Sequence, residues 1–162
     1  NEDYIIFLDE DNWFETYHIE NLVNLCEEKQ LDFACSFRNI FIDGKYDCKD
    51  LCESLVKWET FSSLGKEKKD YLADTSTYCF RRSWLIQNSQ HMHSGWGGDR
   101  RFLNIVRQYA KYETNCLHTL NYSLDSEKMN KNYGGTDFFR KGNEAYLSFY
   151  GGNLPWYTQF TK

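Results

Sequence analysis

The sequence lacks the features typical of nucleic-acid-binding and membrane-spanning proteins. Its 19 basic residues are outnumbered by 24 acidic ones, giving a formal net charge of -5, and they form no basic stripe. This composition argues against a nucleic acid or an anionic membrane surface as a partner. No apolar run approaches the ~20 residues that a membrane-spanning helix needs. Because no secretory signal opens the chain, we expect a cytoplasmic protein, associated with a membrane only through a partner.

The sequence also lacks the cysteine spacings of a zinc or redox motif. None of its six cysteines belongs to a CxxC pair. Cys48 and Cys52 are spaced to share a helix face, but no histidine lies near them to complete a zinc site. A chain of 162 residues can bury a core without disulfides, so we expect reduced, mostly buried thiols.

The first third of the chain shows strand and helix patterns in turn. The apolar run of residues 4–8 predicts a buried, parallel strand. Residues 19–26 have helical spacing, with Thr16 as a candidate N-cap. Residues 32–42 alternate as in a strand, and Asp43-Gly44 is a strong turn signal.

The rest of the chain continues this mixed order. Residues 45–70 have a weak pattern, which predicts a mobile connection or a poorly defined helix. The elements expected after them are a strand at 76–80, a helical turn at 81–86, a glycine-rich loop at 95–98, a helix to about residue 111, a strand at 114–124 and a helix at 137–150. Because 18% of the residues are aromatic and no repeat or linker interrupts the pattern, the chain is expected to form one α/β domain.

Two carboxylates follow the first predicted strand. Asp9 and Asp11 are two residues apart, so in extended backbone their side chains leave the same face. The carboxyl ends of strands in open α/β sheets border the crevice where ligands bind. Mg²⁺ or Mn²⁺ would relieve the repulsion between the two groups. The same acidic turn is also explained by a helix N-terminus, which favours negative charge.

Two other acidic motifs are alternatives for the segment around Asp9 and Asp11. An EF-hand loop needs Asp or Asn at its fifth position and glycine at its sixth, where this chain has Trp13 and Phe14. A haloacid-dehalogenase-like phosphotransferase also places DxD after an apolar strand, and Asp9 would be its nucleophile. Trp13 stands where such enzymes usually have threonine or valine, so this function is kept as an alternative.

Four segments, in this order, resemble family-2-type glycosyltransferases with the GT-A fold. The segments are IFLDEDNWF at 6–14, LADTSTY at 72–78 with RRS at 81–83, GWGGDRRF at 95–102 and LHTLNY at 117–122. Together they cover about residues 4–124, whereas the tail from residue 125 is not part of the resemblance.

The resemblance implies a partial GT-A fold, a mixed sheet flanked by helices. Residues 1–124 would form its metal-binding and acceptor-side part, and residues 125–162 a helical, aromatic-rich extension. The nucleotide-binding units of such enzymes precede the DxD strand and amount to ~100 residues. We therefore expect the chain to be a fragment, or its missing half to come from another chain or a homo-oligomer.

The resemblance also implies roles for the acidic residues. Asp11 would bind Mn²⁺ or Mg²⁺ directly, and Asp9 would contact the nucleotide-sugar donor or a metal-bound water. Asp99 is the candidate general base for an inverting displacement by the acceptor hydroxyl. Many relatives have a Glu-Asp pair here, whereas Gly98 precedes Asp99, which is also explained as a helix cap.

The remaining candidates are Asp74, Trp96, Gly97 and Arg82 on the acceptor side and His118 as a further metal ligand. Each also has a structural explanation. Asp74 fits a polar turn, Trp96 a buried core position, and Arg82 a solvated helix start. A histidine within a strand, such as His118, is more often structural than a ligand.

The function predicted from these patterns is metal-assisted transfer of a sugar from a nucleotide-diphosphate donor to a glycan or other hydroxyl acceptor. A second alternative, besides the phosphotransferase, is a non-catalytic relative that binds glycans or proteins through its aromatic tail. The donor sugar and the acceptor cannot be identified from these residues, because acceptor loops vary freely on one fold.

Overall fold

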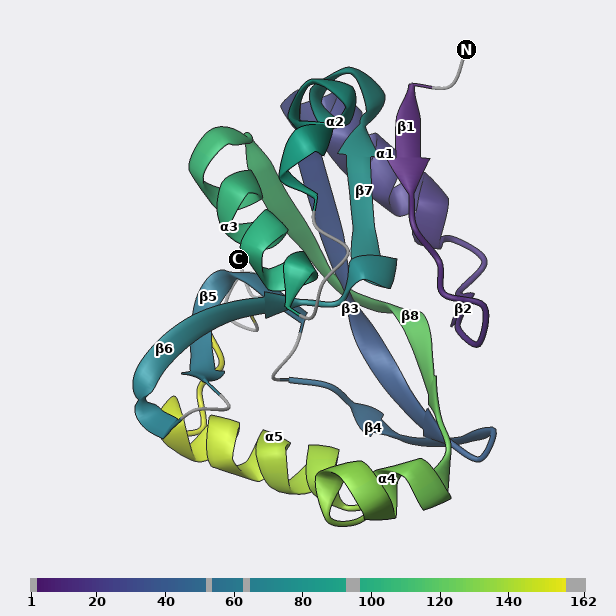
Figure 1. The fold of residues 1–162 in the computed structure, drawn as a ribbon, viewed down its shortest axis with the longest axis vertical. Helices are drawn as coiled ribbons and strands as arrows, with labels where there is room; N and C mark the ends of the chain where they lie inside the picture. The colour runs from purple at the N-terminus through teal and green to yellow at the C-terminus, as the bar shows by residue number, and fades with distance from the viewer. Residues whose placement is uncertain (1–2, 52–53, 63–64, 93–96, 157–162) are drawn as a thin grey trace.

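The computed structural model describes residues 3–51, 54–62, 65–92 and 97–156 (Figure 1). Its larger sheet has the order β1-β7-β3-β8-β2, with β4 added to β3. The strands are β1 (Tyr4–Ile6), β2 (Trp13–Phe14), β3 (Phe33–Ile42), β4 (Lys45–Lys49), β7 (Tyr78–Arg81) and β8 (Tyr112–Leu124). β3 and β8 are parallel, and the other pairs are antiparallel.

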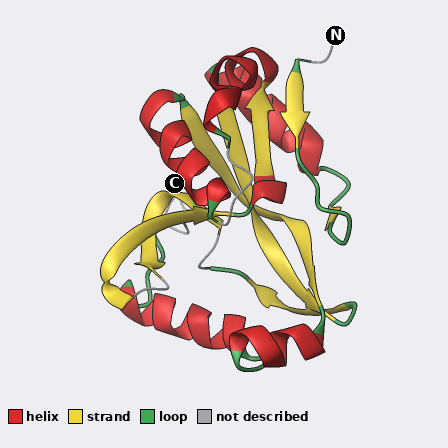
Figure 2. Cartoon of the chain, in the orientation of Figure 1, coloured by secondary structure: helices red, strands yellow, loops and turns green. Residues whose placement is uncertain are grey.

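Helices cover both faces of this sheet, as Figure 2 shows. Alternate side chains of the strands point to opposite faces. Phe33 and Phe80 pack against α2 (Arg82–Asn88) and α3 (Gly98–Tyr109). Ala34 and Cys79, one residue along each strand, pack against α1 (His18–Lys29). The sheet is therefore buried between α1 on one face and α2 with α3 on the other.

The first strand differs from its prediction in two respects. β1 ends at Ile6, and it pairs antiparallel with β7 at the edge of the sheet. Its three residues are only partly buried. Thr16 is also not the N-cap of α1, because Tyr17 holds that position and makes no side-chain cap hydrogen bond.

The segment predicted to be a mobile connection or a poor helix forms strands instead. β5 (Ser54–Ser62) and β6 (Gly65–Ala73) pair as a two-stranded antiparallel sheet. β4 follows the Asp43-Gly44 turn, where the φ angles of 50° and 75° match the tight hairpin that the sequence predicts. Local periodicity missed these strands because their partners, rather than their own pattern, determine their conformation.

The chain after β8 forms two helices below the sheet in Figure 1, α4 (Ser126–Tyr133) and α5 (Phe138–Phe149). α5 is the helix predicted at 137–150. Its Tyr146 packs in one cluster with Phe37 of β3 and with Trp156. The predicted boundary after residue 124 coincides with the end of β8, but this cluster also ties the tail to the central strand.

The five cysteines in the described part of the chain are free thiols, as predicted, and Cys52 lies outside it. Burial raises the pKa of Cys116 to about 11 and that of Cys35 well above its usual value. No helix in the described ranges combines the length and apolar character needed to cross a membrane.

Candidate functional site

The loop after β1 is fixed by a buried serine. The backbone N–H of Asp9 donates to Oγ of Ser76 at 3.2 Å, and the same hydroxyl lies 3.1 Å from Oδ2 of Asp9, to which it donates. Ser76 is fully buried in the short 3₁₀ helix η1 (Thr75–Thr77). Asp9 itself is exposed. The first carboxylate of the DxD motif is therefore anchored at one edge while it remains open to solvent.

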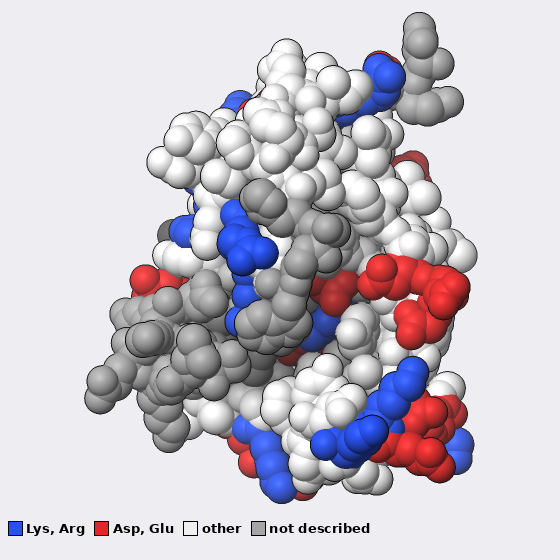
Figure 3. Space-filling model, viewed as in Figure 1, with Lys and Arg blue, Asp and Glu red and all other residues white. Residues whose placement is uncertain are grey.

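Asn12 holds the other end of this loop. Its Oδ1 accepts from the backbone N–H of Ser123 at 2.9 Å, and its Nδ2 donates to Ser76 at 3.4 Å. Beyond it, β2 pairs with β8, with Trp13 opposite Asn121. Asp11 lies between these two anchored points and is exposed. Residues 9–12 form a turn in which the backbone N–H of Asn12 donates to the carbonyl of Asp9 at 3.1 Å, so the extended backbone on which the same-face expectation depended is not found. In Figure 3 acidic side chains gather on this side of the molecule.

An ion network lies behind the loop. Arg38 of β3, whose side chain is 2% exposed, donates from Nε to Oδ2 of Asp50 at 2.7 Å and from Nη1 to Oδ2 of Asp74 at 2.6 Å. Oδ1 of Asp74 accepts from the backbone N–H of Ser76 at 2.9 Å. Both oxygens of Asp74 are thus engaged, Oδ1 with η1 and Oδ2 with Arg38. This placement favours a positioning role for Asp74 over the acceptor contact expected from the sequence.

Asp99 lies on the other side of η1. It is exposed at the second position of α3 and lines a cavity of about 160 Å³ with Thr75, Tyr78 and Phe102. Burial raises the pKa of Tyr78 well above its usual value, and nearby Cys35, Asp99 and Asp74 raise it further. Thr75 borders the cavity of Asp99 and its neighbour Ser76 binds Asp9. The structure therefore brings the candidate base and the DxD loop to the two sides of one short turn.

Gly97 determines where α3 starts. Its φ of 70° is in the left-handed region, which costs a residue with a Cβ more than it costs glycine. Its carbonyl accepts from the backbone N–H of Arg101 in the first turn of the helix. Gly97 thus has a backbone role here, while Trp96 lies outside the described residues.

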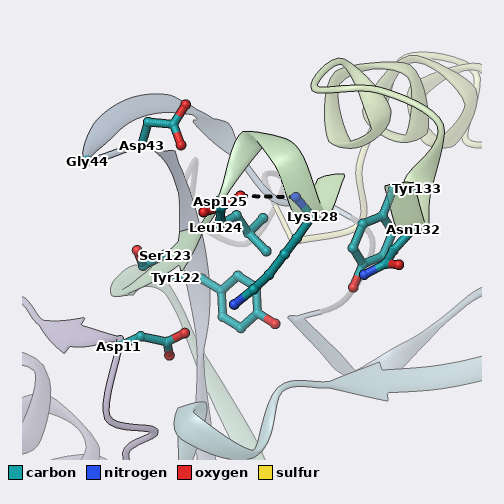
Figure 4. A pocket seen from close by; sticks show the side chains of 10 residues that line it. All are labelled: Asp11, Asp43, Gly44, Tyr122, Ser123, Leu124, Asp125, Lys128, Asn132 and Tyr133. Carbon is teal, nitrogen blue, oxygen red and sulfur yellow. Dashed lines mark hydrogen bonds between the residues drawn. The ribbon is translucent and has the colours of Figure 1, made fainter. Parts of the chain in front are cut away.

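A larger cavity, of about 510 Å³, opens beside Asp11 (Figure 4). Its walls come from the β3–β4 turn, the end of β8 and α4. The lining residues are Asp11, Asp43, Gly44, Tyr122, Ser123, Leu124, Asp125, Lys128, Asn132 and Tyr133. Of the residues predicted for the site, Asp11 is the member of this lining.

His118 is not placed as a third ligand beside the two aspartates. In the described ranges, no three His, Cys, Asp or Glu side chains come together to hold a metal. The ring of His118 packs edge-on against Phe37 at 5.2 Å. Burial lowers its pKa to about 4, and the charge of Lys49 contributes. These contacts fit the structural explanation for this histidine.

Arg82 is also separate from the site. Its backbone N–H donates to the carbonyl of Asp3, and β1 then runs away from it toward Asp9. The side chain of Arg82 is exposed at the start of α2. The structure therefore places Arg82 at the opposite end of β1 from the carboxylates.

The two carboxylates fit a hard divalent cation. Mg²⁺ is commonly bound by one or two carboxylates, with waters and substrate phosphates completing its shell, and Mn²⁺ also accepts oxygen ligands. Asp9 and Asp11 offer such oxygens from one anchored, exposed loop. A cage of three or more protein ligands is not required for this kind of site.

Sequence reasoning did not identify Ser76, Arg38 or Lys128. A signal existed for Arg38, because a charged residue between Phe37 and Ile40 in an apolar strand must have a buried partner. The hydroxyl of Ser76 and the position of Lys128 gave no such signal. Ser76 bonds a residue 67 positions away, and Lys128 lines a cavity with Asp11, which is more than 100 positions away.

No model of a known protein family matches the chain, and no curated protein matches its sequence. Among solved structures, the chain resembles S. aureus TarS 1-349, a staphylococcal glycosyltransferase, in complex with UDP. The TM-score is 0.50 at 13% identity, over 80% of this chain and 38% of that one. A TarS structure with UDP-GlcNAc matches with a TM-score of 0.47 at 10% identity, over 76% of this chain and 35% of that one.

The chain therefore has the mixed α/β fold of part of a glycosyltransferase. It spans about two fifths of the length of the TarS chain solved with UDP.

Proposed function

We propose that this chain supplies the metal-binding and acceptor-side part of an enzyme that transfers a sugar from a nucleotide-diphosphate donor to a hydroxyl acceptor. The observation that supports this most directly is the anchored loop after β1, in which Asp9 and Asp11 are both exposed. The fold likeness to part of TarS, solved with UDP, agrees with a donor of this class.

Asp11 and Asp9 would hold Mn²⁺ or Mg²⁺ with the donor diphosphate. When bound, the ion would neutralise negative charge on the leaving diphosphate. Ser76 keeps Asp9 from turning away, because its hydroxyl bonds both the backbone and the carboxylate of that residue. Asp9 would thus be a pre-positioned oxygen ligand, which lowers the entropy cost of binding.

Asp99 would accept the proton of the acceptor hydroxyl as that oxygen attacks the anomeric carbon. Attack from the face opposite the diphosphate inverts the anomeric centre. Asp99 is exposed, and η1 separates its cavity from the DxD loop.

A calorimetric titration of UDP- and GDP-sugars tests the metal and donor assignment. We expect weak binding that requires Mn²⁺, because the chain spans only about two fifths of the TarS chain. Asp11→Ala should reduce the affinity at least about tenfold, since a lost charged contact is worth roughly 1.5–3 kcal/mol. Glu10→Ala is the matched control, because it removes a neighbouring exposed carboxylate that does not line the cavity.

Tight donor binding that survives Asp11→Ala or chelation would overturn the metal assignment. The phosphotransferase alternative makes a different prediction. Beryllofluoride should then form a stable adduct at Asp9, whereas our proposal predicts none.

A further inference from the structure

The 510 Å³ cavity beside Asp11 is lined mostly by residues that have no part in the proposed metal and base roles. Eight of its ten lining residues come from the end of β8, from the turn after β3 and from α4, and two of those three segments lie outside the four resembling segments. Small-molecule sites have volumes of roughly 300–1,000 Å³. The cavity is therefore large enough for a sugar ring.

The wall formed by α4 is held in place by two aspartates. Oδ1 of Asp125 accepts from the backbone N–H groups of Glu127 and Lys128, at 2.8 and 3.0 Å. Oδ1 of Asp43 accepts from the backbone N–H of Ser126 at 3.0 Å. Below the helix, Met129 is fully buried. These contacts fix α4 against the β3–β4 turn, so the cavity does not depend on a loose helix.

The lining combines aromatic rings with hydrogen-bonding side chains. Lys128 and Asn132 are four residues apart and therefore share one face of α4. Figure 4 shows Lys128 extending over Tyr122 toward the side of the cavity where Asp11 lies. Tyr133, at the end of α4, is 43% exposed. Aromatic rings pack against the apolar faces of sugars, and amide, ammonium and carboxylate groups bind their hydroxyls.

The charge of the cavity favours a neutral ligand. Apart from Asp11, whose charge the proposed cation would offset, the lining carries two carboxylates, Asp43 and Asp125, against the single ammonium of Lys128. A phosphate or carboxylate on the ligand would be repelled by this excess of negative charge. A hydroxyl-rich, uncharged sugar ring would not be repelled.

We propose that this cavity binds a neutral sugar ring of the acceptor, held by Lys128 and Asn132 against Tyr122 and Tyr133. The inference rests on the proposed function, because Asp11 forms one wall of the cavity. A sugar bound there lies next to the metal-bound diphosphate. The tail from residue 125, which lies outside the four resembling segments, would then determine which acceptor the chain takes.

A glycan array with neutral and anionic sugars, probed with the 162-residue chain with and without UDP and Mn²⁺, tests this inference. We expect neutral glycans to bind. The methyl glycoside of a bound neutral sugar should then shift amide resonances of residues 122–133 in NMR titrations. Lys128→Ala and Asn132→Ala should each weaken this binding about fivefold or more, as expected for one lost hydrogen bond.

Matched controls lie on the same helix. Lys131→Ala and Asn130→Ala remove the same side-chain types from exposed positions that do not line the cavity, and should leave the affinity unchanged. Three results would overturn the proposal: no neutral glycan binds under either condition, UDP displaces the sugar, or the control variants weaken binding as much as the cavity variants.

Failure of this proposal is distinguishable from failure of the proposed function. Loss of Mn²⁺-dependent UDP-sugar binding in Asp11→Ala tests the donor site without any acceptor. If that result is obtained while sugar binding is absent, the cavity assignment alone is wrong.

Discussion

Arg38 is a charged residue in a buried strand, and its carboxylate partners come from two different segments. Its guanidinium also lies 4.3 Å from the centre of the Tyr122 ring, which lines the cavity beside Asp11. Through Asp74 and Ser76 it is connected to the DxD loop. One side chain therefore stabilises both the turn behind Asp9 and a wall of the proposed acceptor cavity.

Removing this guanidinium should be strongly destabilising. Arg38→Ala would remove the guanidinium that pairs with Asp50, whose side chain is fully buried. Breaking such a pair from one side costs roughly 3–5 kcal/mol. We expect the free energy of unfolding, measured by urea denaturation, to fall by about this amount.

Arg140→Ala is the control for this prediction. The Arg140 side chain is 54% exposed and pairs with Asp47 at 3.2 Å, so its loss should cost less than ~1 kcal/mol. Equal losses in the two variants would show that the network around Arg38 contributes no more than a surface ion pair.

At the scale of elements, α1 is attached to β8 through a buried histidine. Nδ1 of His18 lies 2.7 Å from Oγ1 of Thr119, and its ring stacks on Phe14 of β2 at 3.9 Å. Burial lowers the pKa of His18 to about 4 from its usual value of 6.5. The folded chain therefore holds this histidine neutral under conditions where the unfolded chain would protonate it.

This difference predicts a loss of stability in acid. Between pH 6.5 and 4 the unfolded state binds more protons than the folded state, so the free energy of unfolding falls as the pH is lowered. For His18 the loss is on the order of 3 kcal/mol over this range. His118 should contribute in the same direction, because its pKa is also lowered to about 4.

Urea midpoints measured from pH 7 to pH 4 check this prediction. In His18→Gln the midpoint should depend less steeply on pH than in the unmodified chain, even if the variant is less stable throughout. An unchanged slope would mean that His18 is not held neutral by the fold.

Strands and helices with their own periodicity could be predicted from the sequence. The strands at 33–42 and 112–124 and the helix at 138–149 lie close to their expected positions. β5 and β6 could not be predicted, because pairing with each other rather than local alternation makes them strands. The direction of β1 was missed for a similar reason, since an apolar run does not identify its neighbour.

The candidate site shows the same division. Two carboxylates two residues apart after a strand point to Asp9 and Asp11 as metal ligands, and this assignment stays a prediction. The sequence could not separate Arg82 from the site, because its position depends on the antiparallel pairing of β1 with β7. Nor could it identify Lys128 and Asn132, whose part in the cavity depends on how α4 docks beside β8.

At the scale of the whole molecule, the DxD loop has a cavity on each side of it. The anchored DxD loop lies between the cavity beside Asp11 and the η1 turn that borders the cavity of Asp99. In our proposal the donor, the acceptor and the base all lie around this loop. This arrangement depends on the long strands β3 and β8, which extend from the helix-covered sheet to α4 (Figure 1).

Paramagnetic broadening by Mn²⁺ tests the central claim most directly, because it locates the ion on the chain. With UDP present, we predict that amide signals of residues 9–12, Ser76 and Ser123 broaden first, and that Asp11→Ala abolishes the effect. Broadening centred elsewhere, or unchanged in Asp11→Ala, would contradict a donor-metal site on this loop.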